Sequence, residues 1–138
     1  MINRSFHMKN DIEEVDRMVM SLKSVVKGIL DSATAFRFEI CLAEALTNSV
    51  KHSETYDKEM PIEVTLTETA SALVVDVFDP VGARFFDICD HAKDLDSVDL
   101  MAESGRGLGL IVQCADAVTY GALEGRNRLA LDFLKPVT

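Results

Sequence analysis

The stretch Glu44-Ala45-Leu46-Thr47-Asn48-Ser49-Val50-Lys51-His52 places polar and charged side chains in a segment that otherwise has the composition of a buried helix. At about 100° per residue, its polar side chains share an arc of roughly 100°. This polar stripe consists of Glu44, Asn48, Lys51 and His52. The main apolar stripe comprises Phe36, Ile40, Ala43, Leu46 and Val50, and the opposite side carries Phe38, Leu42 and Ala45. A helix that is apolar nearly all round is normally buried, and buried polar groups need partners. The polar stripe therefore meets a ligand or a partner group, or else it is the exposed side of an amphipathic helix.

The composition predicts one soluble globular domain over residues 1–138, because 48% of the residues are hydrophobic and 27% are charged. No apolar run approaches the roughly 18 residues that cross a bilayer, and the N-terminus lacks the order of a signal peptide. We therefore expect a cytoplasmic protein without membrane association. The net charge of -9 opposes direct nucleic-acid binding and favours a basic protein partner or a ligand held by backbone amides. The cysteines Cys41, Cys89 and Cys114 are odd in number and widely spaced, so we expect them to be reduced.

Hydrophobic periodicity predicts the element order β-α-α-β-β-loop-α-β-β. The expected elements are a strand at 3–8, a helix capped by Asp11 with apolar positions from Ile12 to Leu30, a helix from Ala33 to Ser53, strands at 62–67 and 73–78, an irregular segment at 83–104, a helix opened by the glycines at 105–109, and strands at 118–121 and 128–133. This grouping is typical of an α+β fold, a two-layer sandwich of a mixed, mostly antiparallel sheet with helices on one face. The long irregular segment in so small a domain indicates a binding loop or lid.

The glycine-rich segment Gly105-Arg106-Gly107-Leu108-Gly109 stands before a short apolar helix whose expected buried positions are Leu108, Ile111, Val112 and Ala115. Backbone amides at such a helix start can hold an anionic phosphate. The segment matches neither a Walker A loop nor the dinucleotide fingerprint. Its glycines are therefore either a phosphate site or only a tight start to the helix.

Asp79 directly follows the apolar strand at 73–78 and opens Asp79-Pro80-Val81-Gly82. The proline removes a ladder donor and the glycine permits a turn, so the strand ends here. A carboxylate at a strand end can accept a hydrogen bond from the amine of adenine. An aspartate before proline is also a common turn residue.

In combination, Glu44 and Asn48 on a helix, Asp79 and Gly82 after a strand, and Gly105 to Gly109 before a helix resemble the N, G1 and G2 boxes of the GHKL ATPase superfamily. The short lid and the absence of a histidine-phosphoacceptor helix make the chain most similar to the anti-sigma-factor serine kinases of the RsbW and SpoIIAB type. The resemblance runs from about residue 10 to residue 133, and it implies the Bergerat ATP-binding fold.

The resemblance also implies roles for individual residues. Asn48 would coordinate Mg²⁺ and Glu44 would act as general base, while Asp79 would select adenine. The nucleotide's phosphates would lie at the last segment of the site, formed by Gly105, Arg106, Gly107, Leu108 and Gly109. His52 matches a tendency of the family, although it and Lys51 are equally well explained as a solvated helix end.

The implied function is an anti-sigma factor and ATP-dependent protein-serine kinase that phosphorylates a STAS-type anti-anti-sigma factor. Its partners would be a sigma factor, the STAS protein and a second copy in a homodimer. One departure from the family is that the loop reads Asp79-Pro80-Val81-Gly82-Ala83, without a glycine two residues after Asp79. A non-catalytic, nucleotide-dependent binding module is therefore the alternative. The detached ATPase domain of a sensor histidine kinase fits the short lid less well.

Overall fold

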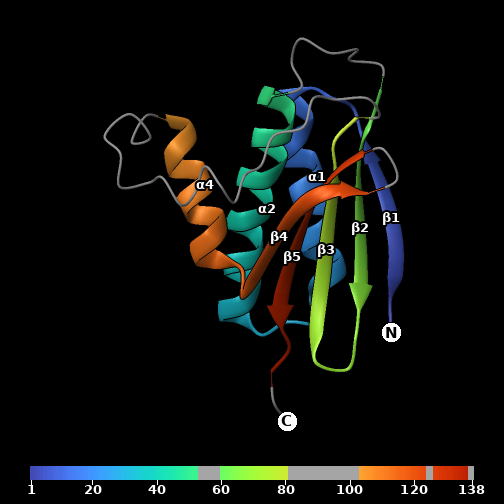
Figure 1. Ribbon diagram of the computed structural model, residues 1–138. Coiled ribbons are helices and arrows are strands. Elements are labelled where there is room, and N and C mark those ends of the chain that lie inside the picture. Colours follow the sequence, from blue (N-terminus) through green and yellow to red (C-terminus); the bar gives the residue numbers. More distant parts are fainter. Residues whose placement is uncertain (53–59, 81–102, 124–125, 137–138) are drawn as a thin grey trace.

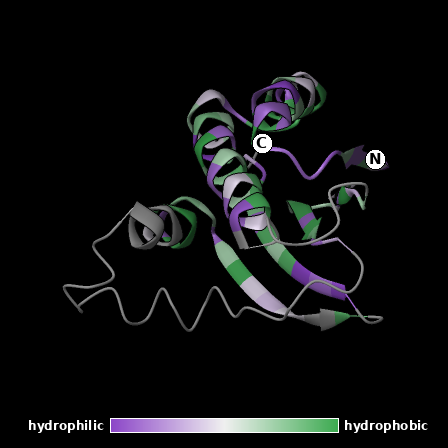
Figure 2. Cartoon of the chain, turned by 90° about the horizontal axis from the view of Figure 1, so that it is seen from above, coloured by the Kyte–Doolittle hydropathy of each residue, from purple (hydrophilic) through white to green (hydrophobic). Residues whose placement is uncertain are grey.

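The computed structural model describes residues 1–52, 60–80, 103–123 and 126–136. Five strands form one sheet in the order β1 (Asn3–Met8), β2 (Ile62–Glu68), β3 (Ala72–Phe78), β5 (Arg126–Leu134) and β4 (Ala117–Leu123). The helical elements are η1 (Ile12–Glu14), α1 (Val15–Val26), α2 (Ser32–His52) and α4 (Glu103–Cys114). Helices α1 and α2 cover one face of the sheet, and α4 lies beside α2 (Figures 1 and 2).

This arrangement confirms the expected α+β sandwich with helices on one face. All four pairings between described strands are antiparallel, so the mixed character that we expected of the sheet is not found among them. The connection from β3 to β5 passes through α4 and the edge strand β4, and it places β3 and β5 next to each other at the centre of the sheet. Although α4 and β4 separate β3 from β5 in the sequence, the two strands are direct neighbours in the sheet.

The first helix ends earlier than its apolar periodicity predicted. Asp11 caps η1 as expected, accepting a hydrogen bond from the Glu13 amide at 3.0 Å. Helix α1 then ends at Val26, because Lys27 is extended and Gly28 has a φ of 94°. A left-handed glycine is a common way to end a helix, and this one turns the chain so that Leu30 still reaches the core, where it is 7% exposed.

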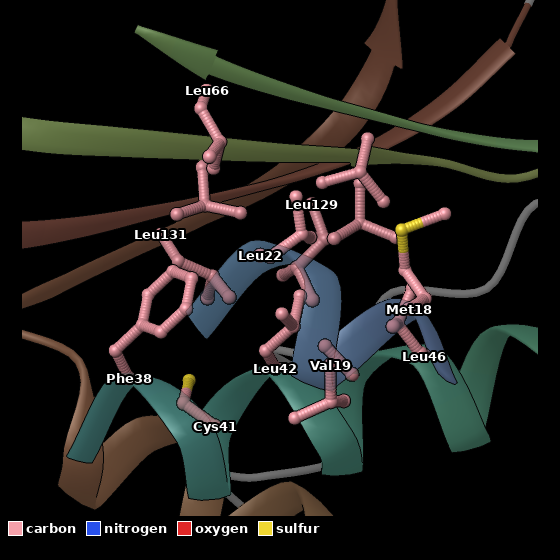
Figure 3. Close-up of a cluster of buried hydrophobic side chains, with 14 of the residues drawn as sticks. Met18, Val19, Leu22, Phe38, Cys41, Leu42, Leu46, Leu66, Leu129 and Leu131 are labelled. Carbon is pink, nitrogen blue, oxygen red and sulfur yellow. The ribbon is translucent and has the colours of Figure 1, made fainter. Parts of the chain in front are cut away.

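The core lies between the inner face of the sheet and helices α1 and α2 (Figure 3). Leu22 of α1, Phe38 of α2 and Leu131 of β5 are fully buried there. The Phe38 ring contacts the ring of Phe133 edge-on, with a centroid separation of 5.5 Å. Such aromatic pairs stabilise a core beyond the area they bury.

Phe36 is not part of this core, which corrects its assignment to the main apolar stripe. Its side chain is 63% exposed, whereas Leu46 and Val50 of the same expected stripe are buried. Phe36 and Phe38 are two residues apart, and this separation turns them about 200° away from each other on a helix. Because Phe38 points at the sheet, Phe36 must point away from it.

No helix in the described part of the chain is both long enough and apolar enough to cross a membrane.

The opposite environments of these two phenylalanines give a direct test of the fold. Phe38→Ala removes a fully buried ring and is expected to lower the free energy of unfolding by about 3–5 kcal/mol. Phe36→Ala, on the same helix, is the matched control and is expected to cost less than about 1 kcal/mol. Urea unfolding followed by circular dichroism measures both values. Equal losses would contradict the placement of α2.

Candidate functional site

Asp79 lies one residue beyond β3 and continues the row of that strand's inward-facing residues. Leu73, Val75 and Val77 are buried against the helices, and Asp79 occupies the next inward position with only 3% of its surface exposed. Its backbone amide donates to the carbonyl of Asn127 at 3.0 Å, which extends the pairing of β3 and β5 by one residue. The sheet geometry therefore carries a carboxylate to the place where an apolar core residue would otherwise stand.

The Asp79 carboxylate is held by uncharged donors from three different elements. Ser49 Oγ of α2 donates to Oδ1 at 2.6 Å. Asn127 Nδ2 of β5 donates to Oδ2 at 3.1 Å, and the Tyr120 hydroxyl of β4 donates to the same oxygen at 3.4 Å. These bonds fix the plane of the carboxylate, so an incoming amine would meet an acceptor of defined direction.

Arg126 holds the backbone of Asp79 from the other side. Its Nε and Nη2 atoms donate to the Asp79 carbonyl at 3.2 and 3.1 Å, and Nη1 lies 3.1 Å from Glu63 Oε1. The guanidinium also lies over the Phe78 ring, with 5.2 Å to the ring centroid. The residue that follows β3 is thus fixed at both its main chain and its side chain.

Glu44 and Asn48 lie one helical turn apart on α2, close to this cluster. Asn48 is 8% exposed and directly precedes Ser49, the residue that binds Asp79, while Glu44 is half-buried. Within the described part of the chain, the Asn48 Nδ2 atom is buried and has no hydrogen-bond partner. Leaving a buried polar atom unsatisfied costs about 1–3 kcal/mol, so this amide is suited to a partner supplied by a ligand.

The rest of the polar stripe does not share this environment. Lys51 is exposed at the end of α2. His52 is the last residue of the helix, and its side chain lies outside the described residues. The structure thus places Asn48 next to Ser49, which binds Asp79, and it places Glu44 one helical turn before Asn48.

The glycine-rich segment lies inside α4 rather than in front of it, because the helix begins at Glu103. Amides beyond the first turn of a helix donate to carbonyls four residues earlier. In this conformation, the amides of Gly107 to Gly109 are therefore committed to the helix. Gly82 and the expected lid up to residue 102 lie outside the described residues, as does the side chain of Arg106.

The second half of α4 is anchored to α2. Ile111 and Ala115 are buried as expected, but Val112 is 44% exposed, so its expected burial is wrong. Arg37 Nη1 donates to the Cys114 carbonyl at 2.8 Å, and Arg37 also lies 3.5 Å from Asp116. The hydrogen bond from Arg37 thus satisfies one of the last carbonyls of α4, which have no partner within the helix.

Cys41 also faces α4, with its thiol 3.7 Å from the Ile111 carbonyl. Burial, with smaller contributions from Cys114 and Glu44, raises the pKa of the Cys41 thiol to about 12. A thiol with so high a pKa stays protonated and unreactive at neutral pH. Cys41 and Cys114 are both free and buried.

Ser49 and Asn127 are site residues that the sequence reasoning missed. Asn127 lies on the inward face of β5 in register with Leu129, Leu131 and Phe133, and it is 4% exposed. The expected strand began at Arg128, one residue too late to include it. A strand extended by one residue would have placed an amide at a core position, which is a recognisable signal for a polar site.

The comparisons with known proteins agree with the fold. A family model described as a histidine kinase-like ATPase domain matches residues 8–133. Among solved structures, the chain is similar to a chain of the crystal structure of the SiaB-SiaC complex from Pseudomonas aeruginosa. The TM-score is 0.58 and the identity 14%, covering 95% of this chain and 89% of that chain, and at this identity the likeness shows the fold alone. No curated protein matches the sequence. Because the family model spans almost the entire chain, the protein belongs to the histidine kinase-like ATPase, or GHKL, domain family.

Proposed function

We propose that this protein is a cytoplasmic, ATP-dependent protein-serine kinase and anti-sigma factor. It would sequester a sigma factor and phosphorylate a STAS-type anti-anti-sigma factor. Membership of the ATPase family supports nucleotide binding. The observation that carries the proposal is the buried Asp79 carboxylate, oriented by Ser49 and Asn127 beside the helix that bears Glu44 and Asn48.

At the adenine end, Asp79 accepts a hydrogen bond from the exocyclic amine of the base. Guanine carries a carbonyl in the corresponding place, and a carboxylate cannot donate to it. The same buried carboxylate that binds ATP would therefore reject GTP. Gly82, which lies outside the described residues, is proposed as a further nucleotide-binding residue.

At the phosphate end, the residues present fit an Mg²⁺ ion. No group of three or more histidine, cysteine, aspartate or glutamate side chains that could cage a metal occurs in the described ranges. Mg²⁺ bound with a nucleotide does not need such a cage, because it is held by one or two protein ligands, by phosphates and by water. Rotation of the Asn48 amide would exchange its unsatisfied Nδ2 for Oδ1 and present an oxygen ligand. When bound, the ion neutralises charge that develops during phosphoryl transfer.

Glu44 would accept the proton of the serine hydroxyl as that oxygen attacks the γ-phosphorus, while the bond from the γ-phosphorus to the β,γ-bridging oxygen breaks and ADP leaves. Its position one turn from Asn48 puts the base and the metal ligand on the same helical face. The phosphates would be held by backbone amides from Gly105 to Gly109, with Leu108 in the same segment and Arg106 as a charge clamp. Since α4 begins at Glu103, this binding requires its first turns to unwind.

A protein partner is supported by the solved structure that contains the similar chain, which is a complex of two proteins, SiaB and SiaC. Phosphorylation adds about 1.5–2 negative charges at neutral pH. Because the kinase has a net charge of -9, the added negative charge would be repelled, so the modified STAS protein would bind more weakly and dissociate. A homodimer is the assembly that we expect from the resemblance.

The rival proposal is a binding module that takes up nucleotide but transfers no phosphate. The missing glycine after Asp79 and the helical conformation of the glycine-rich segment favour it. Calorimetry with ATP, together with a transfer assay on the same sample, separates the two. Binding without transfer supports the module, and absence of binding rejects both proposals.

Glu44→Gln tests the role of the general base. The change keeps the side-chain shape but removes the proton acceptor, so serine phosphorylation is expected to fall by at least about 100-fold. The dissociation constant for ATP should change by less than about threefold, because the base contacts the acceptor rather than the nucleotide. The assay uses labelled ATP, Mg²⁺ and a purified STAS-domain protein as the acceptor. Glu39→Gln on the same helix is the control, and undiminished transfer by Glu44→Gln would remove Glu44 from this role.

Asp79→Asn tests adenine recognition. Loss of a hydrogen bond to a charged group costs about 1.5–3 kcal/mol, so ATP should bind about 10- to 100-fold more weakly. The ratio of the dissociation constants for GTP and ATP should fall as well. Asp76→Asn, on the same strand but on the outer face of the sheet, is the control. Isothermal calorimetry gives both constants, and thermal unfolding of each sample confirms that the variant is folded.

Ser49→Ala tests whether the donors to Asp79 position it for the base. Loss of the 2.6 Å bond should weaken binding of adenosine and of ATP by the same factor, about 5- to 10-fold. The Mg²⁺ dependence of ATP binding should be unchanged. Ser24→Ala, which removes an exposed serine hydroxyl on α1, is the control. A loss confined to ATP would contradict a role at the adenine end.

A further inference from the structure

Helices α1 and α2 form a groove of about 480 Å³ at the end of the domain opposite to Asp79. Its walls comprise the last turn of α1, the Gly28 turn and the first two turns of α2. The residues that line it include Lys23, Lys27, Leu30, Ala35, Phe36 and Glu39. Phe36 and Ser49 are 13 residues apart on α2, which is about 20 Å along the helix axis. The groove is therefore separate from the proposed nucleotide site.

The groove and the α1 surface beside it carry large apolar side chains that the fold does not use. Phe36 lines the groove and is 63% exposed. Met20 does not line the groove, but it lies one turn before Lys23 on α1 and is 60% exposed. Exposed aromatic residues beside a groove are typical anchors of protein interfaces, and methionine adapts its shape to a partner. The core is complete without Phe36, because Phe38 takes the inward position. The exposure of Phe36 therefore has no explanation in the packing of the domain.

The rim of the groove on α1 is basic, although the protein as a whole has a net charge of -9. Lys23 lies in the last turn of α1, and Lys27 directly follows the helix; both line the groove. Lys23 reaches Glu39 across the groove at 3.2 Å, but both side chains are substantially exposed, so this pair contributes little. Lys27 has no ion-pair partner in the part of the chain that the structure describes. A basic rim beside an apolar floor is complementary to a segment with acidic and apolar sides.

A second copy of the chain is a poor occupant. Each groove is lined by Lys23, Lys27 and Glu39, so a two-fold contact of groove against groove would bring more lysines than glutamates together, and an excess of like charge in an interface is unfavourable. Nucleic acid is a poor occupant too, since two lysines neutralise few phosphates. The remaining occupant is a helix from another protein, lying across α1 and α2 as a third helix.

We propose that the α1–α2 groove docks an acidic amphipathic helix of a partner protein. Apolar side chains at i, i+3, i+4 and i+7 of that helix contact Phe36 and Leu30, and carboxylates on its flank pair with Lys23 and Lys27. The docking does not involve Glu44, Asn48 or Asp79, so it holds for the kinase and for the non-catalytic module alike.

The test uses a designed 18-residue amphipathic helical peptide with leucines on one face and glutamates along both flanks. A second peptide carries lysine in place of every glutamate. Fluorescence anisotropy with the full chain is expected to give at least tenfold tighter binding of the glutamate peptide, and this preference should shrink as salt is raised. Amide chemical shifts that change on binding should map to the end of α1 and the start of α2.

Phe36→Ala and Lys27→Glu probe the two parts of the surface. Phe36→Ala should weaken binding of the glutamate peptide at least tenfold. Lys27→Glu should abolish the preference for the glutamate peptide over the lysine peptide. Both variants should bind ATP as the unmodified chain does. Leu134→Ala, which shortens another exposed apolar side chain, is the control and should bind the peptide normally. Equal binding of both peptides by the unmodified chain, or unchanged binding by Phe36→Ala, would overturn the proposal. Loss of self-association in Phe36→Ala on sedimentation would also overturn it, because the occupant would then be a second copy.

Discussion

The end of the domain that contains the candidate site depends on one constraint, the burial of the Asp79 carboxylate. Removing a carboxylate from water costs on the order of several kcal/mol unless donors replace the water. Here the replacements come from α2, β4 and β5, while the backbone amide pairs with Asn127. The carboxylate can therefore stay buried only while the helix and the sheet keep their relative positions. The same contacts that stabilise the burial thus define the geometry of the proposed adenine site.

Helix α2 connects this polar cluster to the apolar core. Its 21 residues lie between the sheet, α1 and α4, and its inward face changes along its length from Phe38 through Leu42 and Leu46 to Ser49. Apolar packing at the first part sets the position and rotation of the helix. Because the helix is rigid, the same packing directs Asn48 and Ser49 at the end of β3. The hydrophobic core therefore positions a polar site that contributes little apolar burial of its own.

Periodicity was enough to predict the sandwich and the long central helix, because these depend on repeating patterns that extend over many residues. The grouping of Glu44, Asn48 and Asp79 into one site came instead from the resemblance to a family. The positions of single residues were harder to predict. The end of α1 was set by one left-handed glycine, Gly28, against an apolar pattern that continued past it. Phe36 fitted an apolar stripe of α2. Which stripe of α2 is buried, however, depends on where the sheet, α1 and α4 lie around the helix. Asn127 needed the register of β5 to within one residue, and a shift of one residue moves a side chain to the other face.

The two halves of α4 differ in what holds them, and this difference bears on how phosphate could bind. Residues Ile111 to Cys114 are fixed by burial of Ile111 and by the hydrogen bond from Arg37 to the Cys114 carbonyl. The preceding turns contain Gly105, Gly107 and Gly109, and each glycine costs about 0.8–1 kcal/mol of helix stability relative to alanine. Unwinding the glycine-rich turns therefore costs much less than unwinding an average helix of that length. The amide groups that unwinding releases would donate charge-assisted hydrogen bonds to phosphate, and these bonds would offset the free-energy cost of unwinding. A helix that is weak at its start and anchored at its end can accordingly form a phosphate site without disturbing the contact between α4 and α2.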